Sequence, residues 1–350
     1  MMRTPRQSRQ HGAALLMAML TVALVATLAA GALWQQWRSV EIEASERSRV
    51  QAGWILSGAL DWARLILRED ARSGGVDHLG EPWSVELAES RLSTFLAMDR
   101  SNSELEDDVF LSGRITDAQS RMNVMNLIVG GKVSEPDLQS FARLFDLLGL
   151  NPVELDQMSE KLLLAVGSGG GITLNTGAGG VTVASAAPDD GAPLTPRRVE
   201  QLRWLGLSAA TLRQLQSHIT VLPARTPLNL NTAGAEAISA SIPISLVDAR
   251  RMVAERERKP FQTLAEAGLA IAAAPGALNT NLLSVATRFF EVRGRLRMEH
   301  LVIEERSLVQ RNGTEVTVLW RERSALNPPV APSGMQVGGL SENAVLTMRP

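Results

Sequence analysis

Several residue types are absent or scarce in this chain of 350 residues, and each shortage excludes a kind of chemistry. There is no cysteine, which excludes disulfides, thiolate metal sites, Fe–S clusters and cysteine nucleophiles. The four histidines are scattered and show no His-x-x-x-His spacing, so a zinc protease site is not expected. Neither a Gly-x-Ser-x-Gly motif nor a Gly-Lys-Ser/Thr phosphate loop occurs. The sequence therefore predicts a protein that is not an enzyme.

An excess of positive charge is also missing. The formal net charge is −2 and the sequence pI is near 6.2, whereas nucleic-acid-binding proteins usually have a strongly basic surface. The mean hydropathy of +0.02 is typical of a soluble protein. This average is misleading, because the apolar residues are concentrated in one run near the N-terminus.

That run is uncharged from Gly12 to Trp37 and almost purely apolar from Ala13 to Leu33. About 20 such residues cross a hydrocarbon core of ~30 Å. A secretory signal peptide is the alternative, but its apolar region is shorter, about 7–15 residues. Three arginines precede the run, and the positive-inside rule places them in the cytoplasm. We therefore expect a single-pass protein of the bacterial inner membrane, with the chain after Arg38 in the periplasm.

The residues before the run resemble a type IV prepilin-like leader, which is short, basic and ends in glycine, here Gly12. The resemblance implies that a membrane peptidase cleaves after Gly12 and that Ala13 becomes N-methylated. The fifth mature residue of this class is normally glutamate, but here it is Met17. A carboxylate inside the bilayer is costly unless it is paired. A subunit without it needs no neighbour in front of it, as expected at the tip of a filament.

The helical pattern continues beyond the membrane segment to about Arg72, where Ser-Gly-Gly follows. A helix of about 60 residues is about 90 Å long. Its first half must therefore pack in the membrane or in a filament. Apolar residues spaced as on one helix face predict a helix interface at Ile55, Ala59, Trp62 and Ile66.

Strand patterns lie on both sides of a mainly helical segment. Val109–Ile115 and Phe290–Met298 alternate between apolar and polar residues, as in an antiparallel strand with one solvated face. Two β-rich runs flank Asn312-Gly313, which is a strong hairpin signal. Helices inserted between strands that pair with one another imply an inserted domain in an α+β fold. Such helices are predicted at Asp137–Leu148, Pro152–Val166, Thr195–Leu205 and Ser208–Gln216, and as a pair within Asn231–Glu266.

The segment Leu228–Glu266 resembles a helix-hairpin-helix unit. DNA-binding versions have a glycine-rich hairpin, because backbone N–H groups must approach a phosphate. Here the hairpin is Ile242-Pro243-Ile244, which removes the room and one N–H donor. A structural or protein-binding role is favoured, with no nucleic-acid partner. The alternative function is a membrane-anchored helix-hairpin-helix protein for DNA binding or uptake.

Taken together, the motifs resemble those of the K class of minor pseudopilins of type II secretion systems. Ser120 and Met122 stand where the family has glycine and phenylalanine. The resemblance implies a pilin-like α+β fold, with a long N-terminal helix on a small antiparallel sheet and a large inserted all-α domain of helix-hairpin-helix or SAM-like type. Besides the leader, it is carried by the segments Val76–Trp83, Asp117–Leu127, Pro196–Leu205 and Leu228–Ala233.

The resemblance also implies the division of the chain and its partners. A subunit of this class initiates or caps a short periplasmic pseudopilus that exports folded proteins. Its partners are I- and J-type pseudopilins, with H-type as a further candidate, the prepilin peptidase and the inner-membrane assembly platform. The expected segments are a leader (1–12), a transmembrane segment (13–37), two parts of the pilin-like module (38–116 and 285–324), the helical insert (117–284) and a disordered tail (325–350).

Some members of the family bind calcium in the insert through an acidic motif. This sequence lacks that motif, and only Asp189 and Asp190 remain as calcium candidates in the corresponding region. No cofactor is therefore expected.

Overall fold

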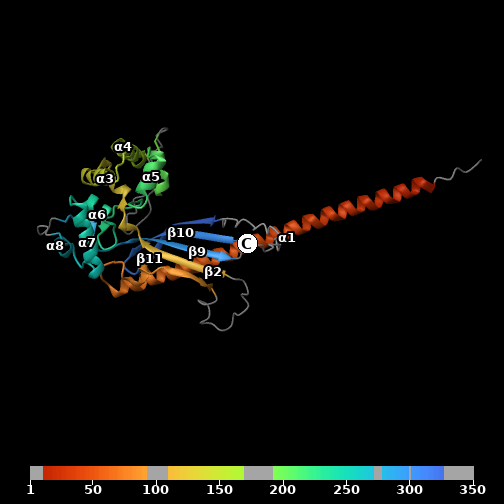
Figure 1. Cartoon of the computed structure of the whole chain (residues 1–350), viewed down its shortest axis with the longest axis horizontal. Helices are drawn as coiled ribbons and strands as arrows, with labels where there is room; N and C mark the ends of the chain where they lie inside the picture. The colour runs from red at the N-terminus through yellow and green to blue at the C-terminus, as the bar shows by residue number, and fades with distance from the viewer. Residues whose placement is uncertain (1–10, 93–108, 169–191, 272–277, 299–300, 327–350) are drawn as a thin grey trace, which may run out of the picture. The chain divides into compact units, whose positions relative to one another are not determined.

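Figure 1 shows a computed structural model of the whole chain. The structure describes residues 11–92, 109–168, 192–271, 278–298 and 301–326. The chain divides into two compact units, Met1–Gly58 and Ala59–Pro350. Each unit is described by itself below.

The first unit contains the beginning of the long helix α1 (His11–Ser73). The apolar side chains between Ala13 and Leu33 are all exposed. This helix is long and apolar enough to cross a membrane. It ends within one residue of the predicted boundary, where Gly74 adopts a positive φ of 66°.

The second unit contains a five-stranded antiparallel sheet with the order β1-β2-β9-β10-β11 (Figure 1). The predicted hairpin is confirmed, because Asn312 pairs with Glu315 and Gly313 takes the positive φ that such a turn requires. The strands are β1 (Leu87–Arg91), β2 (Val109–Asp117), β9 (Phe289–Met298), β10 (Leu301–Asn312) and β11 (Glu315–Leu326).

One face of this sheet packs against the C-terminal end of α1. Leu60, Ala63 and Leu67 of the helix form a buried cluster with apolar residues of the sheet. Trp83, in the 3₁₀ helix η1 (Pro82–Ser84), completes the cluster and contacts Phe290 edge to face, with ring centroids 5.2 Å apart. Because side chains alternate across a strand, residues next to this cluster in sequence face the opposite side of the sheet.

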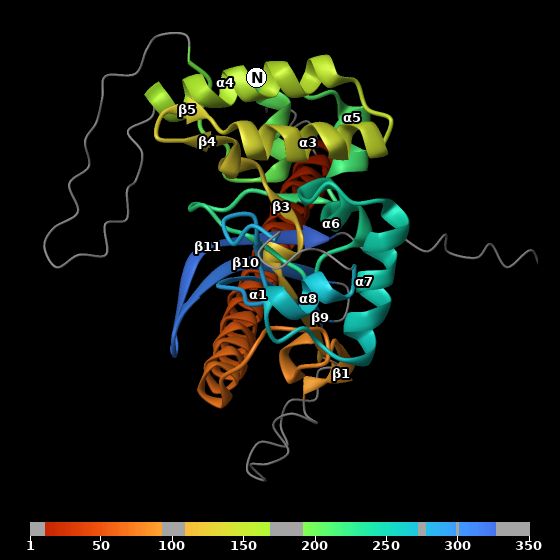
Figure 2. The same ribbon diagram turned by 90° about the vertical axis from the view of Figure 1, so that its left-hand side faces the viewer.

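A helical insert with its own core separates β2 from β9, although these two strands pair directly. Its core includes Phe141, Phe145 and Leu202. In Figure 2, α3 and α4 lie side by side, and α6 packs against α3 and α7. The helices are α3 (Glu135–Leu147), α4 (Pro152–Ser168), α5 (Ala209–Leu215), α6 (Ala235–Ser241), α7 (Leu246–Arg258), α8 (Leu264–Leu269) and the 3₁₀ helices η2 (Ala118–Ser120), η3 (Val124–Leu127) and η4 (Val199–Leu205).

Short strand pairs connect the parts of the insert. β3 (Met122–Asn123) pairs with β6 (Ile219–Thr220), and β7 (Leu228–Asn229) pairs with β8 (Leu283–Ser284), both in parallel. β4 (Ile128–Val129) and β5 (Lys132–Val133) form a small hairpin.

Two of the predicted helices differ from the structure. The helix expected over Thr195–Leu205 is the shorter 3₁₀ helix η4, which begins at Val199. Thr195 stands before a proline and therefore avoids the helical conformation, and Arg198, directly before η4, is also extended with φ −142° and ψ 156°. The pair expected within Asn231–Glu266 is three helices, since Lys259-Pro260 ends α7 before α8 begins. The predicted α+β class is confirmed.

Candidate functional site

Two of the sequence motifs meet at the carboxylate of Asp117, which is buried at the end of β2. It accepts hydrogen bonds from Asn229 Nδ2 at 2.9 Å, Thr232 Oγ1 at 2.5 Å and Thr287 Oγ1 at 2.6 Å. The backbone N–H of Gln119 is a further donor at 2.6 Å. Burial raises the pKa of Asp117, and these four hydrogen bonds oppose the increase. The carboxylate therefore ties the insert to the strand from which it departs.

Asn123 fixes the next part of the same motif. Its Oδ1 accepts from the N–H groups of Met125 and Leu222, at 3.1 and 3.0 Å. Its Nδ2 donates to the carbonyl of Ala224 at 2.9 Å and to Thr226 Oγ1 at 3.1 Å. A single buried amide thus joins the start of the insert to a loop about 100 residues further along the chain.

A third motif, Val76–Trp83, lies at the same junction, because Asn229 Nδ2 donates both to the carbonyl of Asp77 and to Asp117. Arg311 of β10 makes ion pairs with Asp77 and with Asp70 of α1, the latter at 2.5 Å. The carboxylate of Asp77 also accepts from the N–H of Thr287 at 2.6 Å. Burial is the main cause of the raised pKa of Asp77. Three segments far apart in sequence are therefore joined at the point where the insert returns to the sheet.

These acidic residues form the one group with metal-ligand spacing found among the described residues, namely Asp70, Asp77 and Glu81. Arg311 already supplies a positive charge to the two aspartates. Glu81 accepts from Trp83 Nε1 at 2.7 Å, and burial raises its pKa to about 7. The arrangement is that of a structural ion-pair network.

Hydrogen bonds within the helix-hairpin-helix segment hold its start against its second helix and the residues that follow. Both amide atoms of Asn231 bond to the backbone of Phe261, each at 2.9 Å. Arg256 is buried and donates to the carbonyl of Leu230. Ile242, in the hairpin, is also buried. Arg256 is therefore not available to a phosphate. Arg250, Arg251 and Arg258 of the same segment are exposed, and Arg251 and Arg258 lie 3.6 Å from Asp248 and Glu255, respectively.

Comparison with known proteins agrees with these motifs. Two models of the family "Type II secretion system (T2SS), protein K" match residues 120–224 and 228–286, which are the insert. The chain is 28% identical over 290 residues to type II secretion system protein K of Pseudomonas aeruginosa, covering 81% of this chain and 83% of that protein. It is 28% identical over 336 residues to the protein K of Pectobacterium carotovorum, covering 90% and 97%.

The chain matches the protein K family of type II secretion systems over the insert and is similar to its members over most of its length. The predicted recognition of a K-class minor pseudopilin is thus confirmed. The fold is also similar to a chain of the crystal structure of the GspK-GspI-GspJ complex from enterotoxigenic Escherichia coli. The TM-score is 0.59 at 18% identity, over 80% of this chain and 98% of that chain.

The predicted processing site of this chain lies at the N-terminal end of α1. Met17 is four positions after Ala13, so the two residues lie on one face of the helix, and both are exposed. The helix includes Gly12, the residue after which cleavage is predicted. Cleavage after Gly12 and N-methylation of Ala13 stay predictions.

The predicted interface stripe lies beside the buried face of the helix. In the second unit, Ile66 packs partly against the core, while Trp62 has an exposed fraction of 50%. Ala59 is half-buried, and Ile55, in the first unit, is also half-buried. The residues that pack fully on the sheet are Leu60, Ala63 and Leu67. Apart from Ile66, which packs partly on the core, the stripe therefore differs from the residues of the core cluster, and its role as an interface stays a prediction.

The calcium candidates Asp189 and Asp190 lie outside the described residues. Sequence reasoning also missed the residues that close the junction, chiefly Arg311 and Thr287. Neither stands in one of the recognised motifs, and only the pairing of β9 with β10 brings them to Asp77 and Asp117.

Proposed function

We propose that this chain is a minor pseudopilin of the K class that is anchored in the inner membrane by α1 and stands at the tip of a short periplasmic pseudopilus. There it initiates or caps assembly of the pseudopilus for the export of folded proteins. The mechanism is assembly by helix packing, and no catalytic step is involved.

The observation that carries the tip position is the absence of a carboxylate from the apolar part of α1. No charged residue occurs between Gly12 and Trp37, and Met17 occupies the fifth mature position. A buried membrane carboxylate needs a partner charge, which in a filament comes from the next subunit. Without that requirement, this chain can stand first in the filament.

The proposed partners are the I- and J-type pseudopilins, with H-type as a further candidate. The solved relative with this fold comes from a complex with GspI and GspJ. The exposed apolar side chains of α1 supply a surface for helix packing or lipid, since a stripe of this size is not left in water. The assembly platform and the prepilin peptidase are further partners.

The proposed orientation puts the N-terminus in the cytoplasm and the second unit in the periplasm. Three arginines precede the apolar run, and the positive-inside rule retains such residues on the cytoplasmic side.

The substitution Met17→Glu tests the tip position. We expect it to reduce secretion in a strain that depends on this chain, because the new carboxylate has no partner in the membrane. Met17→Leu is the matched control and should secrete normally. Equal secretion by Met17→Glu and Met17→Leu would contradict the tip position. Co-purification of I- and J-type pseudopilins with the intact chain tests the partners separately.

A further inference from the structure

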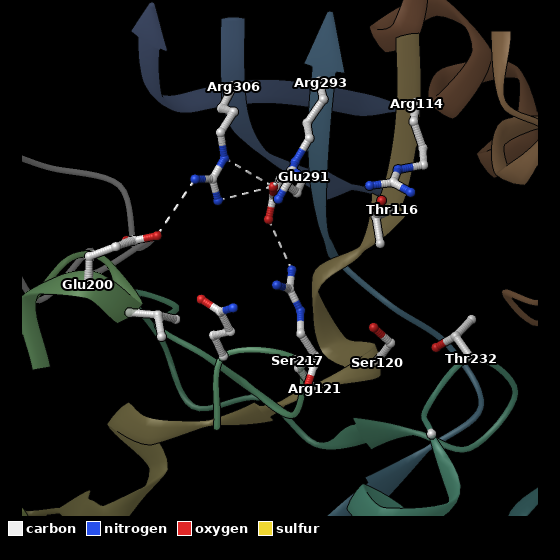
Figure 3. Close-up of a pocket in the computed structure, with 13 residues that line it drawn as sticks. Arg114, Thr116, Ser120, Arg121, Glu200, Ser217, Thr232, Glu291, Arg293 and Arg306 are labelled. Carbon is white, nitrogen blue, oxygen red and sulfur yellow. Dashed lines mark hydrogen bonds and ion pairs between the residues drawn. The ribbon is translucent and has the colours of Figure 1, made fainter. Parts of the chain in front are cut away.

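A pocket of about 630 Å³ lies between the sheet and the insert (Figure 3). It opens on the face of β2 and β9 opposite to the side chains that pack on α1, because Arg114 and Arg293 alternate with Ile115 and Val292. Its volume falls in the range of ligand sites, about 300–1,000 Å³. Of the thirteen residues that line it, all but Val199 and Gly234 are polar or charged. Such a lining suits a charged ligand rather than an apolar one.

Three arginines cross the pocket wall in one row. Arg114 of β2 pairs directly with Arg293 of β9, and Arg293 pairs with Arg306 of β10. Like charges on directly paired residues destabilise a sheet. Arg121, from the start of the insert, adds a fourth guanidinium group to the lining. The lining also contains two glutamates, so its net charge is +2.

The buried carboxylate of Glu291 neutralises part of this charge. It accepts from Arg293 Nε at 2.6 Å and Arg121 Nη2 at 3.0 Å, and it pairs with Arg306 at 3.2 Å. Burial alone would raise the pKa of Glu291, but the three arginines outweigh it and lower this pKa to about 2. Glu291 therefore stays ionised, and its single carboxylate interacts with three guanidinium groups.

Some guanidinium N–H groups of the lining do not bond to Glu291 and remain available to a ligand. Arg114 is exposed, and Figure 3 shows no hydrogen bond or ion pair between it and the other residues drawn. Arg121 Nε also has no hydrogen-bond partner among the described residues, but it is buried and is therefore not a donor that a ligand in the pocket can reach. The second glutamate, Glu200, lies 3.7 Å from Arg306 and is mostly exposed, so it holds Arg306 weakly.

We propose that this arginine pocket binds an acidic peptide segment of a partner protein, with two neighbouring Asp or Glu side chains. Guanidinium groups bind carboxylates in a bidentate geometry, through two parallel N–H···O hydrogen bonds. Arg114 can donate both of these hydrogen bonds to the first carboxylate of the peptide. Arg121 and Arg306 offer donors to the second. Two carboxylates balance the net charge of +2. The volume exceeds the needs of a single small anion, since one water takes about 30 Å³.

The test uses the full-length protein in detergent and fluorescently labelled peptides that contain paired glutamates or paired glutamines. We expect the glutamate peptide to bind and the glutamine peptide not to bind, with affinity falling as salt is raised. Arg114→Gln should weaken binding about tenfold, because one charge-assisted contact is lost. Since Arg114 is exposed, this variant should unfold at the wild-type temperature.

Arg295→Gln is the matched control. Arg295 is an exposed arginine on the same face of β9, two residues from Arg293, and it does not line the pocket. Its substitution should leave peptide binding unchanged. Equal losses in both variants, or equal binding of both peptides, would overturn the proposal. Competition by inorganic phosphate as tight as that of the glutamate peptide would show a small-anion site and would also overturn it. The measurement does not depend on where the chain stands in a pseudopilus.

Discussion

The two parts of helix α1 differ in what surrounds their apolar side chains. In the first unit the side chains of Ala13–Leu33 are exposed, whereas Leu60, Ala63 and Leu67 in the second unit are buried against the sheet. One continuous helix therefore contains two kinds of segment. The apolar side chains of the first have no packing partner within the described part of the chain, and those of the second belong to the core. Substitutions in the first segment should alter location and assembly, and those in the second should alter folding.

The largest effect should come from Gly12→Ala, which alters the predicted processing site and leaves the second unit intact. We expect complete loss of processing and of secretion. Mass spectrometry of the mature chain should find Ala13 at the N-terminus in the wild type and not in Gly12→Ala. Gly31→Ala is a matched control in the same helix, because an added Cβ there meets no atom within 4 Å. Normal processing of the Gly12→Ala chain would contradict the leader assignment.

Phe290→Ala should have the largest effect on folding. Phe290 is fully buried against Trp83, and removal of a buried aromatic ring costs about 3–5 kcal/mol. Thermal unfolding of the second unit should shift accordingly. Leu28→Ala, in the exposed part of α1, is the control and should leave that transition unchanged. Equal shifts of the unfolding temperature in Phe290→Ala and Leu28→Ala would contradict the difference between the exposed and the buried part of the helix.

Asp117→Ala tests the junction of the insert and the sheet. The change leaves the donors of Asn229, Thr232 and Thr287 without an acceptor. We expect a loss of about 3 kcal/mol in the free energy of unfolding. Asp117→Asn keeps one acceptor oxygen and should cost less. If denaturant unfolding shows the two variants equally stable, the hydrogen bonds to this carboxylate are not what holds the junction.

A smaller effect should appear with pH, through Glu291. The three surrounding arginines lower its pKa from the ordinary value of 4.5 to about 2. A depressed folded-state pKa stabilises the fold above the unfolded-state pKa, and this stability is lost as the pH falls from about 4.5 to about 2. Glu291→Gln should flatten this part of the curve of unfolding free energy against pH. An unchanged slope would assign the acid sensitivity to other groups.

Local signals in the sequence predicted much of the fold. Gly74 ends α1 and Asn312-Gly313 makes the hairpin, because both depend on residues adjacent in the chain. The contacts of Arg311 and the row formed by Arg114 and Arg293 could not be predicted in this way. They depend on the register between strands, and the chain between β2 and β9 is too long for spacing to define that register.

The pairing of β2 with β9 has a consequence for the order of folding. Asp117 pairs with Phe290, so the sheet forms only when a loop of about 170 residues closes. Loop closure of this length slows folding if the loop is an open coil. A prefolded insert removes that delay, because its two ends already lie together at Asp117 and Thr287, which are joined at 2.6 Å. We therefore expect β2 to join β9 only after the insert has folded, whereas β9, β10 and β11 can pair earlier because short connections join them.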